Sequence, residues 1–257
     1  MKRYFTFCLM AAFCLFSRAQ EKYADIDGQK FRCKILGSGN ITVIFESGMS
    51  DSLETWGSIP DTIALSAKVF LYDRADIGKS DTSRQKRTIP NMVQELKSLL
   101  NHEKINPPFI LVGHSLGGYI TRYFCSTYPE DIKGLLLLDP SPEAYWEGMS
   151  NEDLANYIKG GTEWYRTRFK PRYRKEWVEF IPNMVYMHDL KIQKELPVIL
   201  VSATQTNWYR YQKRQISGFN NARQVELKGI HHIYKDYPTE TIGYIRELIK
   251  NSAKVNQ

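Results

Sequence analysis

The chain has 257 residues, a length sufficient for one large domain with a sizeable hydrophobic core. Hydrophobic residues make up 42% of it and aromatic residues 13%, which excludes a disordered polypeptide. The formal net charge of +7 falls to +4 if the first 19 residues are removed, because Lys2, Arg3 and Arg18 are lost and no acid is. So mild a charge does not favour nucleic acid as a partner, and we expect none.

The N-terminus has the pattern of a secretory signal peptide. Two basic residues precede an apolar stretch at residues 4–16, which is too short to span a bilayer comfortably. Small residues at Ser17 and Ala19 then occupy the positions that signal peptidase reads. We therefore expect residues 1–19 to be a signal peptide and residues 20–257 to be an exported, periplasmic or secreted protein without stable membrane insertion. A retained N-terminal anchor is the alternative.

Cleavage at this point would leave two of the four cysteines, Cys33 and Cys125. An exported protein can oxidise such a pair to a disulfide. Cys33 lies in a predicted strand and Cys125 in a predicted helix, however, and we expect two buried free thiols.

Strand and helix patterns alternate along the chain. Residues 31–36 and 41–45 have the pattern of an early β-hairpin around a glycine-rich turn, and a first helix falls within residues 51–68. The elements predicted after it are a strand at 69–72, a helix at 89–102, a strand at 108–112, a helix at 119–128, strands at 134–138, 197–201 and 223–227, and a helix at 238–250. Apolar strands that alternate with helices predict an α/β fold, with a mostly parallel sheet covered on both faces.

Residues 141–190 interrupt this alternation, because they are too long for a simple crossover and carry few strand signals. The segment is rich in aromatic residues, namely Tyr145, Trp146, Tyr157, Trp164, Tyr165, Trp177 and Tyr186. We expect a helical cap insertion over the carboxyl edge of the sheet, which would exclude water and form an apolar acyl pocket. An ordinary crossover with decorations is the alternative.

The sequence Gly113-His114-Ser115-Leu116-Gly117 lies between a buried strand and a helix. This is the context of a nucleophile elbow, a sharp turn that holds the serine in a strained backbone conformation. Residues two positions away must be small, and both are glycine. We therefore predict that Ser115 is a nucleophile with an exposed hydroxyl at the end of the sheet, near a helix N-terminus that favours negative charge.

A serine hydroxyl needs a base within hydrogen-bond reach, and the base needs an acid to orient it. His231 and His232 follow the last predicted strand, in a loop that returns to the sheet edge where Ser115 lies. We favour His231 as the base and interpret His232 as a neighbour that packs or faces solvent.

The acid is predicted from the ends of the strands. The strand at residues 197–201 is followed by a loop without a carboxylate, whereas Asp139 ends the preceding strand. Asp139 is therefore the predicted acid, with Glu143 and Asp189 in reserve and a turn-capping role as the alternative for Asp139. The predicted triad has the chain order serine, acid, histidine.

Acyl chemistry also needs two backbone N–H groups that stabilise an oxyanion. We expect one from Leu116, directly after the nucleophile, and one from Met49, in the loop after the strand at 41–45. Gly48 would let that loop approach closely, and a simple glycine turn is the alternative.

Two charged segments have structural interpretations. The loop at residues 72–80 follows a strand, and we expect an ion pair there that holds the loop rather than a catalytic role. Residues 166–175 contain six basic residues and no acid, which we interpret as a solvated face of the cap. Attraction of anionic substrates, an anionic envelope surface or nucleic acid is the alternative for this segment.

Together these features resemble the α/β-hydrolase superfamily, in particular bacterial serine esterases and proline-iminopeptidase-like hydrolases of the alpha/beta hydrolase fold family. The resemblance spans residues 31–250 and rests on segments 45–49, 72–75, 113–118 and 137–140 and on His231 seven residues before Pro238. It implies the α/β-hydrolase fold, with Ser115 as nucleophile, His231 as base, and Met49 and Leu116 as oxyanion donors. The sequence departs from the pattern at Ser47, where the family commonly has a histidine, and in lacking an acid after the penultimate strand.

The leading hypothesis is an exported serine hydrolase that cleaves a carboxylic ester, or an amide, by a Ser-His-Asp acyl-enzyme mechanism. The alternatives are an acyltransferase on the same fold, a peptidase that releases N-terminal residues, and a non-catalytic ligand-binding pseudoenzyme. The sequence carries no metal-binding motif, phosphate loop or dinucleotide motif, so we expect no cofactor. The expected partner is a small-molecule acyl substrate.

Overall fold

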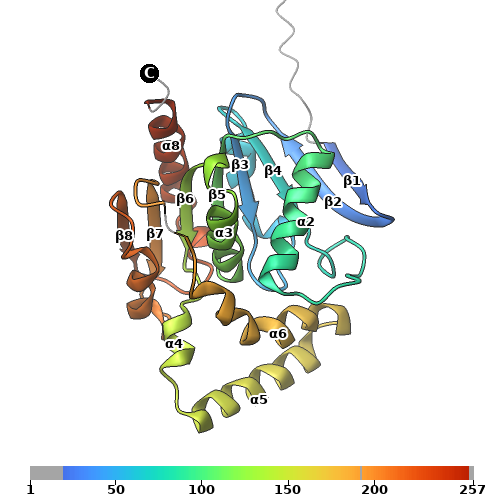
Figure 1. The fold of residues 1–257 in the computed structure, drawn as a ribbon, viewed down its shortest axis with the longest axis vertical. Helices are drawn as coiled ribbons and strands as arrows, with labels where there is room; N and C mark the ends of the chain where they lie inside the picture. Colours follow the sequence, from blue (N-terminus) through green and yellow to red (C-terminus); the bar gives the residue numbers. More distant parts are fainter. Residues whose placement is uncertain (1–19, 192, 255–257) are drawn as a thin grey trace, which may run out of the picture.

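An eight-stranded sheet forms the centre of the computed structural model, which describes residues 20–191 and 193–254 (Figure 1). The strand order is β1-β2-β4-β3-β5-β6-β7-β8. The strands are β1 (Gln20–Ile26), β2 (Gln29–Leu36), β3 (Thr42–Glu46), β4 (Lys68–Tyr72), β5 (Phe109–His114), β6 (Ile132–Leu138), β7 (Val198–Ala203) and β8 (Ala222–Leu227). β2 pairs antiparallel with β1 and with β4, and all the other pairs are parallel, which confirms the predicted mostly parallel sheet.

The predicted hairpin of residues 31–36 with 41–45 is wrong. β2 pairs with β1 and β4, whereas β3 lies between β4 and β5. Every residue of β3 is buried, which suits a strand with a neighbour on each side and helices over both faces. The glycine-rich segment between β2 and β3 therefore carries the chain past the position of β4 instead of forming a tight turn.

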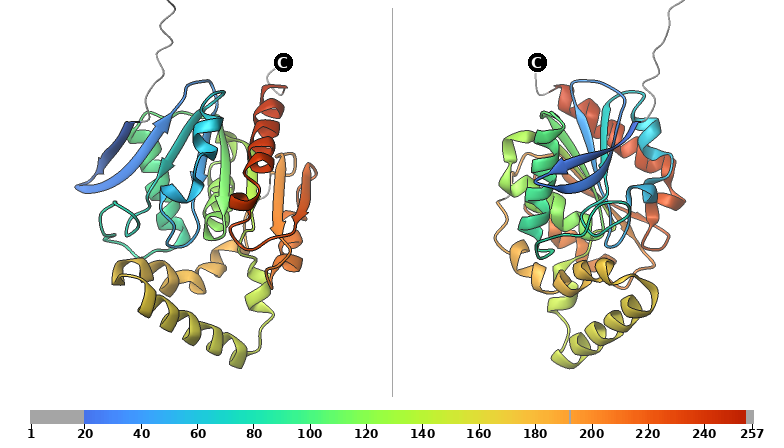
Figure 2. Two further views of the ribbon diagram at one scale, coloured as in Figure 1. Left: turned by 180° about the vertical axis from the view of Figure 1, so that it is seen from behind. Right: turned by 90° about the vertical axis from the view of Figure 1, so that its right-hand side faces the viewer.

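Helices cover both faces of this sheet (Figure 2). One face carries α2 (Ile89–His102) and α3 (Leu116–Thr127), and the other carries α1 (Ile59–Ile63) and α8 (Pro238–Lys254). The shorter elements outside the cap are η1 (Leu53–Trp56), η2 (Pro129–Asp131), η5 (Tyr209–Ile216) and α7 (Ile233–Asp236). The sheet therefore separates two hydrophobic layers.

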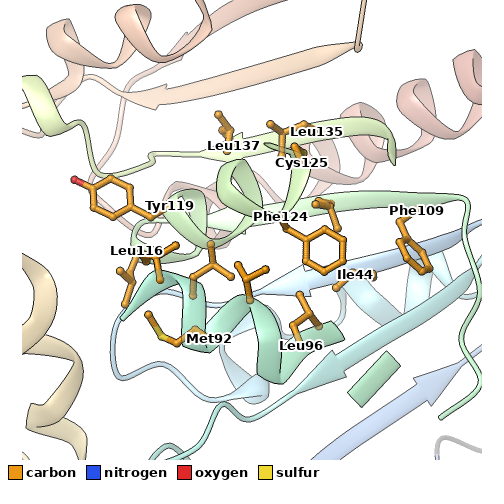
Figure 3. Packing of buried hydrophobic residues seen from close by; sticks show 14 of the residues in the cluster. Ile44, Met92, Leu96, Phe109, Leu116, Tyr119, Phe124, Cys125, Leu135 and Leu137 are labelled. Carbon is orange, nitrogen blue, oxygen red and sulfur yellow. The ribbon is translucent and has the colours of Figure 1, made fainter. Parts of the chain in front are cut away.

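Apolar residues at helical spacing form a stripe on α2 that packs against α3 and the sheet. Met92 and Leu96 recur at helical spacing and are fully buried against α3 and the sheet (Figure 3). They meet Tyr119 and Phe124 of α3 in the same hydrophobic cluster. This packing fixes α3 on the sheet, and with it the residue that precedes the helix.

The segment between β6 and β7 is helical and lies beyond the carboxyl ends of the strands (Figure 1). We call residues 141–190 the cap. Its elements are α4 (Glu143–Glu147), α5 (Asn151–Arg168), η3 (Pro171–Tyr173), α6 (Arg174–Phe180) and η4 (Pro182–Met187). Aromatic rings connect these elements, since Trp177 of α6 stacks on Tyr165 of α5 with centroids 5.2 Å apart.

The predicted signal peptide, residues 1–19, lies outside the described residues. Within residues 20–191 and 193–254, no helix has the length and apolar character needed to cross a bilayer. In the same part of the chain, Cys33 and Cys125 are free and buried, so no disulfide joins them.

Candidate active site

Ser115 occupies the sharp turn between β5 and α3. Its backbone has φ 54° and ψ −119°, a strained conformation for a residue with a side chain. A Cβ atom at Gly117 would lie 2.2 Å from the carbonyl oxygen of Glu46, and one at Gly113 would lie 2.6 Å from that of Gly117. Gly117 therefore lets the turn approach β3 closely, and Gly113 lets the end of β5 approach the first turn of α3.

The side chain of Ser115 begins a chain of hydrogen bonds that joins three predicted residues. Its Oγ lies 2.8 Å from Nε2 of His231, and Nδ1 of His231 lies 2.7 Å from Oδ2 of Asp139. A carboxylate only accepts hydrogen bonds, so Nδ1 of His231 donates to Asp139 and Nε2 is free to accept the hydroxyl proton of Ser115. The arrangement can transfer a proton from the hydroxyl to the imidazole.

Asp139 is completely buried and held from several sides. Its Oδ1 accepts hydrogen bonds from the backbone N–H of Ala203 at 3.2 Å and from Nε2 of Gln212 at 2.7 Å. Its Oδ2 is thereby left to His231. The carboxylate sits at the end of β6 and reaches past β7 to the loop after β8, which explains why the loop after β7 needs no acid.

The reserve acids do not join this group. Glu143 receives a hydrogen bond from Arg122 at 2.5 Å and another from Gln215 at 3.0 Å, and Asp189 is exposed at the end of the cap. Within the described residues, Asp139 is thus the carboxylate that meets His231.

Sequence reasoning missed two residues that support the site, Gln212 and Trp208. Gln212 is fully buried and also donates to the carbonyl of Pro140 at 2.8 Å. Trp208 meets the ring of His231 edge-on, with centroids 5.2 Å apart. Trp208 directly precedes η5, and Gln212 lies within it. The sequence of this segment has no clear helix or strand pattern, so its position beside Asp139 could not be predicted.

The expected oxyanion donors belong to two segments that meet at Ser115. Leu116 is the first residue of α3, where backbone N–H groups have no partner within the helix and the helix dipole favours negative charge. Met49 follows β3 and lines the same cavity as Ser115. Its loop is fixed by Arg74, which donates to the carbonyls of Ser47 at 2.7 Å and Gly48 at 2.6 Å.

The ion pair expected in the loop at residues 72–80 is present, and its partners lie outside that loop. Arg74 is buried between Glu46 at the end of β3 and Glu176 on α6, each at 2.7 Å. Burial opposes the charge on Arg74, but the two carboxylates hold its pKa well above its usual value. Burial raises the pKa of Glu46, an effect that Arg74 and a 2.6 Å hydrogen bond from Tyr72 oppose.

The basic segment at residues 166–175 is solvated in part, as expected, since Arg166, Arg168 and Lys170 are exposed. Other basic residues of the segment contact the loop after β4. Arg172 donates to the carbonyl of Gly78 at 2.5 Å, and Lys175 donates to that of Ser83 at 3.0 Å. These contacts attach the cap to the loop after β4. The prediction of a solvated face did not include this structural role.

A cavity of about 430 Å³ lies above Ser115, between the sheet and the cap. Ser115 is only 8% exposed, and its hydroxyl faces this cavity. The prediction of an exposed hydroxyl did not anticipate that the cap covers it. Seven aromatic side chains line it, namely Trp146, Tyr157, Trp164, Tyr165, Trp177, Phe180 and Trp208. A larger hollow of about 800 Å³ is bordered by Pro197 and Asn221, at the opposite ends of β7 and β8, remote from the site.

The amino-acid sequence is similar to those of several bacterial proteins. The protein YqjL of Bacillus subtilis is 43% identical over 122 residues, which are 47% of this chain and 48% of YqjL. The chain thus matches about half the length of that relative. YbdG of the same organism is 29% identical over 276 residues, covering 88% of this chain and 84% of YbdG. The pimeloyl-(acyl-carrier protein) methyl ester esterase of Wigglesworthia glossinidia brevipalpis is 28% identical over 131 residues, 49% of this chain and 48% of the esterase.

Solved structures share the fold at lower identity. Est816, described as an N-acyl homoserine lactone degrading enzyme, has a TM-score of 0.68 and 18% identity, covering 88% of this chain and 99% of Est816. A thermophilic esterase from Thermogutta terrifontis has a TM-score of 0.65 and 16% identity, covering 91% and 99% of the two chains. The alpha/beta hydrolase fold family itself matches residues 41–237, and the chain belongs to that family.

Proposed function

We propose that this protein is a serine hydrolase that cleaves a carboxylic ester through an acyl-enzyme. The observation that carries the proposal is the hydrogen-bonded chain from Ser115 through His231 to Asp139. A nucleophile, a base and an orienting acid in this order are what acyl transfer requires. The match to the family supports hydrolase chemistry and leaves the substrate open, because this fold hosts many reactions.

In the first half of the reaction, Oγ of Ser115 attacks the ester carbonyl carbon while Nε2 of His231 accepts the hydroxyl proton. Asp139 stabilises the imidazolium that forms, through the 2.7 Å hydrogen bond at Nδ1. The imidazolium then donates its proton to the oxygen of the departing alcohol, and the acyl group stays on Ser115. In the second half, His231 deprotonates a water molecule that attacks the acyl carbon. The imidazolium then returns the proton to Oγ of Ser115 as the bond to the acyl group breaks and the acid leaves.

The negative charge on the carbonyl oxygen is stabilised by two backbone N–H groups, those of Met49 and Leu116. The N-terminus of α3 contributes its dipole at the same point. Arg74 supports this function indirectly, because its hydrogen bonds to Ser47 and Gly48 hold the loop of Met49 in place.

The cavity favours a small or medium-sized apolar acyl or alcohol group. Its volume of about 430 Å³ and its aromatic lining suit a substrate without charge next to the ester. The methyl ester cleaved by the Wigglesworthia relative and the lactone degraded by Est816 are esters of this general kind. We extend that chemistry, the cleavage of a carboxylic ester, to this chain as part of the proposal.

A panel of p-nitrophenyl esters with acyl chains of increasing length tests the proposal, with Ser115→Ala beside the wild type. We expect turnover by the wild type and a loss in Ser115→Ala of at least about 10⁴-fold. Ser141→Ala is the matched control, because Ser141 lines the same cavity with its Oγ 3.5 Å from Oγ of Ser115, and its hydroxyl has no hydrogen bond to His231 among the described residues. Equal hydrolysis by Ser115→Ala and the wild type would refute the assignment.

Acyl transfer is the second candidate, because the cap leaves Ser115 only 8% exposed and restricts the access of water. Product analysis with added alcohols separates the two reactions. A new ester formed at the expense of the free acid supports transfer, whereas free acid alone supports hydrolysis.

Export is also part of the proposal and rests on the sequence pattern of residues 1–19. Expression of the full chain in a bacterial host, followed by fractionation and intact-mass measurement, tests it. We expect a mature protein that begins at Gln20 and is found outside the cytoplasm. Full-length protein in the cytoplasmic fraction would contradict this part.

A further inference from the structure

Three potential metal ligands converge on one wall of the cavity. They are Asp51 in the loop after β3, His114 at the end of β5, and His232 just before α7. The ligand atoms are Oδ2 of Asp51, Nδ1 of His114 and Nε2 of His232, all within 4.8 Å of one another. Nε2 of His232 donates a hydrogen bond to Oδ2 of Asp51 at 3.2 Å, and a metal ion would take the place of this proton. Oδ2 of Asp51 lies 3.7 Å from Nδ1 of His114.

The tautomer of His114 leaves a ligand atom available. Nε2 of His114 lies 2.9 Å from the carbonyl oxygen of His231, and a carbonyl can only accept, so Nε2 carries the proton. Nδ1 therefore has a free lone pair, and Oδ2 of Asp51 lies 3.7 Å from it. The side chain is 1% exposed, and within the described residues Nδ1 has no hydrogen-bond partner. A histidine whose second nitrogen donates to a carbonyl is the usual form of a metal ligand.

The space beside these atoms is kept open by Gly48. A Cβ atom at this position would lie 2.7 Å from Nδ1 of His114 and 2.9 Å from Oδ2 of Asp51. Ligand atoms around a tetrahedral Zn²⁺ are about 3.3 Å apart, given bonds of about 2.0–2.1 Å. The two distances from Asp51, 3.2 and 3.7 Å, are close to that spacing.

We propose that Asp51, His114 and His232 form a binding site for a divalent transition-metal ion of the Zn²⁺ class. Two imidazoles and one carboxylate are a ligand set that such ions favour. All three residues line the cavity, so a fourth coordination position would be open to a water molecule or a substrate oxygen. None of the three belongs to the proposed triad, and the site therefore does not depend on the proposed function.

Titration of the metal-free protein with CoCl₂ and ZnCl₂ tests the site. We expect one equivalent of Co²⁺ to produce visible absorption bands of a low-coordinate ion, and Zn²⁺ to displace it in calorimetry. Asp51→Asn and His232→Gln should each weaken binding by at least about tenfold, since even groups that only support metal ligands are worth about 10–100-fold. The matched control is His188→Gln, which removes an exposed imidazole also paired with a carboxylate, Glu147, at 2.5 Å.

His231→Gln separates this proposal from the proposed function. It removes the imidazole of His231 but keeps the backbone carbonyl that orients His114, so we expect the hydrolysis of esters to be lost and metal binding to remain. Circular dichroism and melting curves with and without ZnCl₂ verify the fold of each variant, and the wild type should melt at a higher temperature with Zn²⁺. Absence of binding by the wild type, or undiminished binding by both ligand variants, would overturn the proposal.

Discussion

Arg74 and Glu176, which are 102 positions apart in the sequence, form a buried ion pair in which Nε of Arg74 donates to Oε1 of Glu176 at 2.7 Å. Oε2 of Glu176 also accepts a hydrogen bond from the backbone N–H of Ser50 at 2.9 Å. Since Arg74 fixes the carbonyls of Ser47 and Gly48, the pair connects α6 of the cap to the loop that carries Met49. The position of the cap and that of the proposed oxyanion donor are therefore linked.

Glu176→Gln should impair both stability and activity. The substitution keeps the shape of the side chain but removes the charge that faces Arg74, and we expect the free energy of unfolding to fall by about 2 kcal/mol. We also expect kcat/KM for an ester to fall at least about tenfold, because small displacements of catalytic groups are costly. Urea denaturation and ester hydrolysis measure the two effects.

The control for this variant is Glu163→Gln, which removes a carboxylate from an ion pair on the cap surface. Glu163 and Arg166 lie on α5 with exposed side chains, so their pairing contributes little. We expect stability and kcat/KM close to the wild type. A Glu176→Gln protein that behaves like Glu163→Gln would show that the cap does not position the loop.

Asp139→Asn tests the unusual placement of the acid at the end of β6. The amide can present an N–H to His231 and favour the wrong imidazole tautomer, and we expect kcat/KM to fall about 10⁴-fold. Asp189→Asn, at an exposed position of the cap, should retain wild-type activity. A loss of activity in Asp189→Asn but not in Asp139→Asn would identify Asp189 as the acid instead.

Trp164→Ala tests the role of the cap in substrate selection. Trp164 lines the cavity and is 43% exposed, so its removal should open the apolar wall at a modest cost in stability. We expect KM to rise several-fold for the longer acyl esters and to change little for acetate. Ile158→Ala, on the same helix and 39% exposed, is the control for truncating an apolar side chain. A uniform change across all chain lengths would argue against an acyl-binding role.

The two cysteines should be inert in the native protein. Burial raises the pKa of both Cys33 and Cys125 to about 12, so at pH 8 almost no reactive thiolate is present. Iodoacetamide at pH 8, followed by peptide mapping, should modify neither residue in the folded protein and both after denaturation. Rapid modification of the native protein would contradict the buried positions, and failure after denaturation would indicate a disulfide.

The sequence predicted the fold wherever the pattern is local. The strand at β5, the helix α2 and the elbow between β5 and α3 all follow from short runs of apolar residues and from glycine at fixed positions. The early hairpin was wrong because β2 and β3 both have a strand pattern and only a glycine-rich segment separates them in the sequence. Nothing local shows that β4 lies between them. Strand order depends on contacts between distant segments.

The same limit applies to the site. Ser115, His231 and Asp139 could be proposed because each follows a strand, and ends of parallel strands meet at one edge of a sheet. The contacts of Asp139 with Gln212, of Arg74 with Glu176, and of Asp51 with His232 join positions 73, 102 and 181 residues apart. Such pairings are set by how the cap and the loops pack, and no spacing in the sequence predicts them.

The most direct test of the central claim, that Ser115 is activated by His231, is labelling of the protein with a fluorophosphonate probe, read by intact mass. We expect a single adduct on the wild type, no adduct on Ser115→Ala, and labelling of His231→Ala slowed by several orders of magnitude. Folded wild-type protein that takes up no probe, or an adduct that persists on Ser115→Ala, would contradict the account.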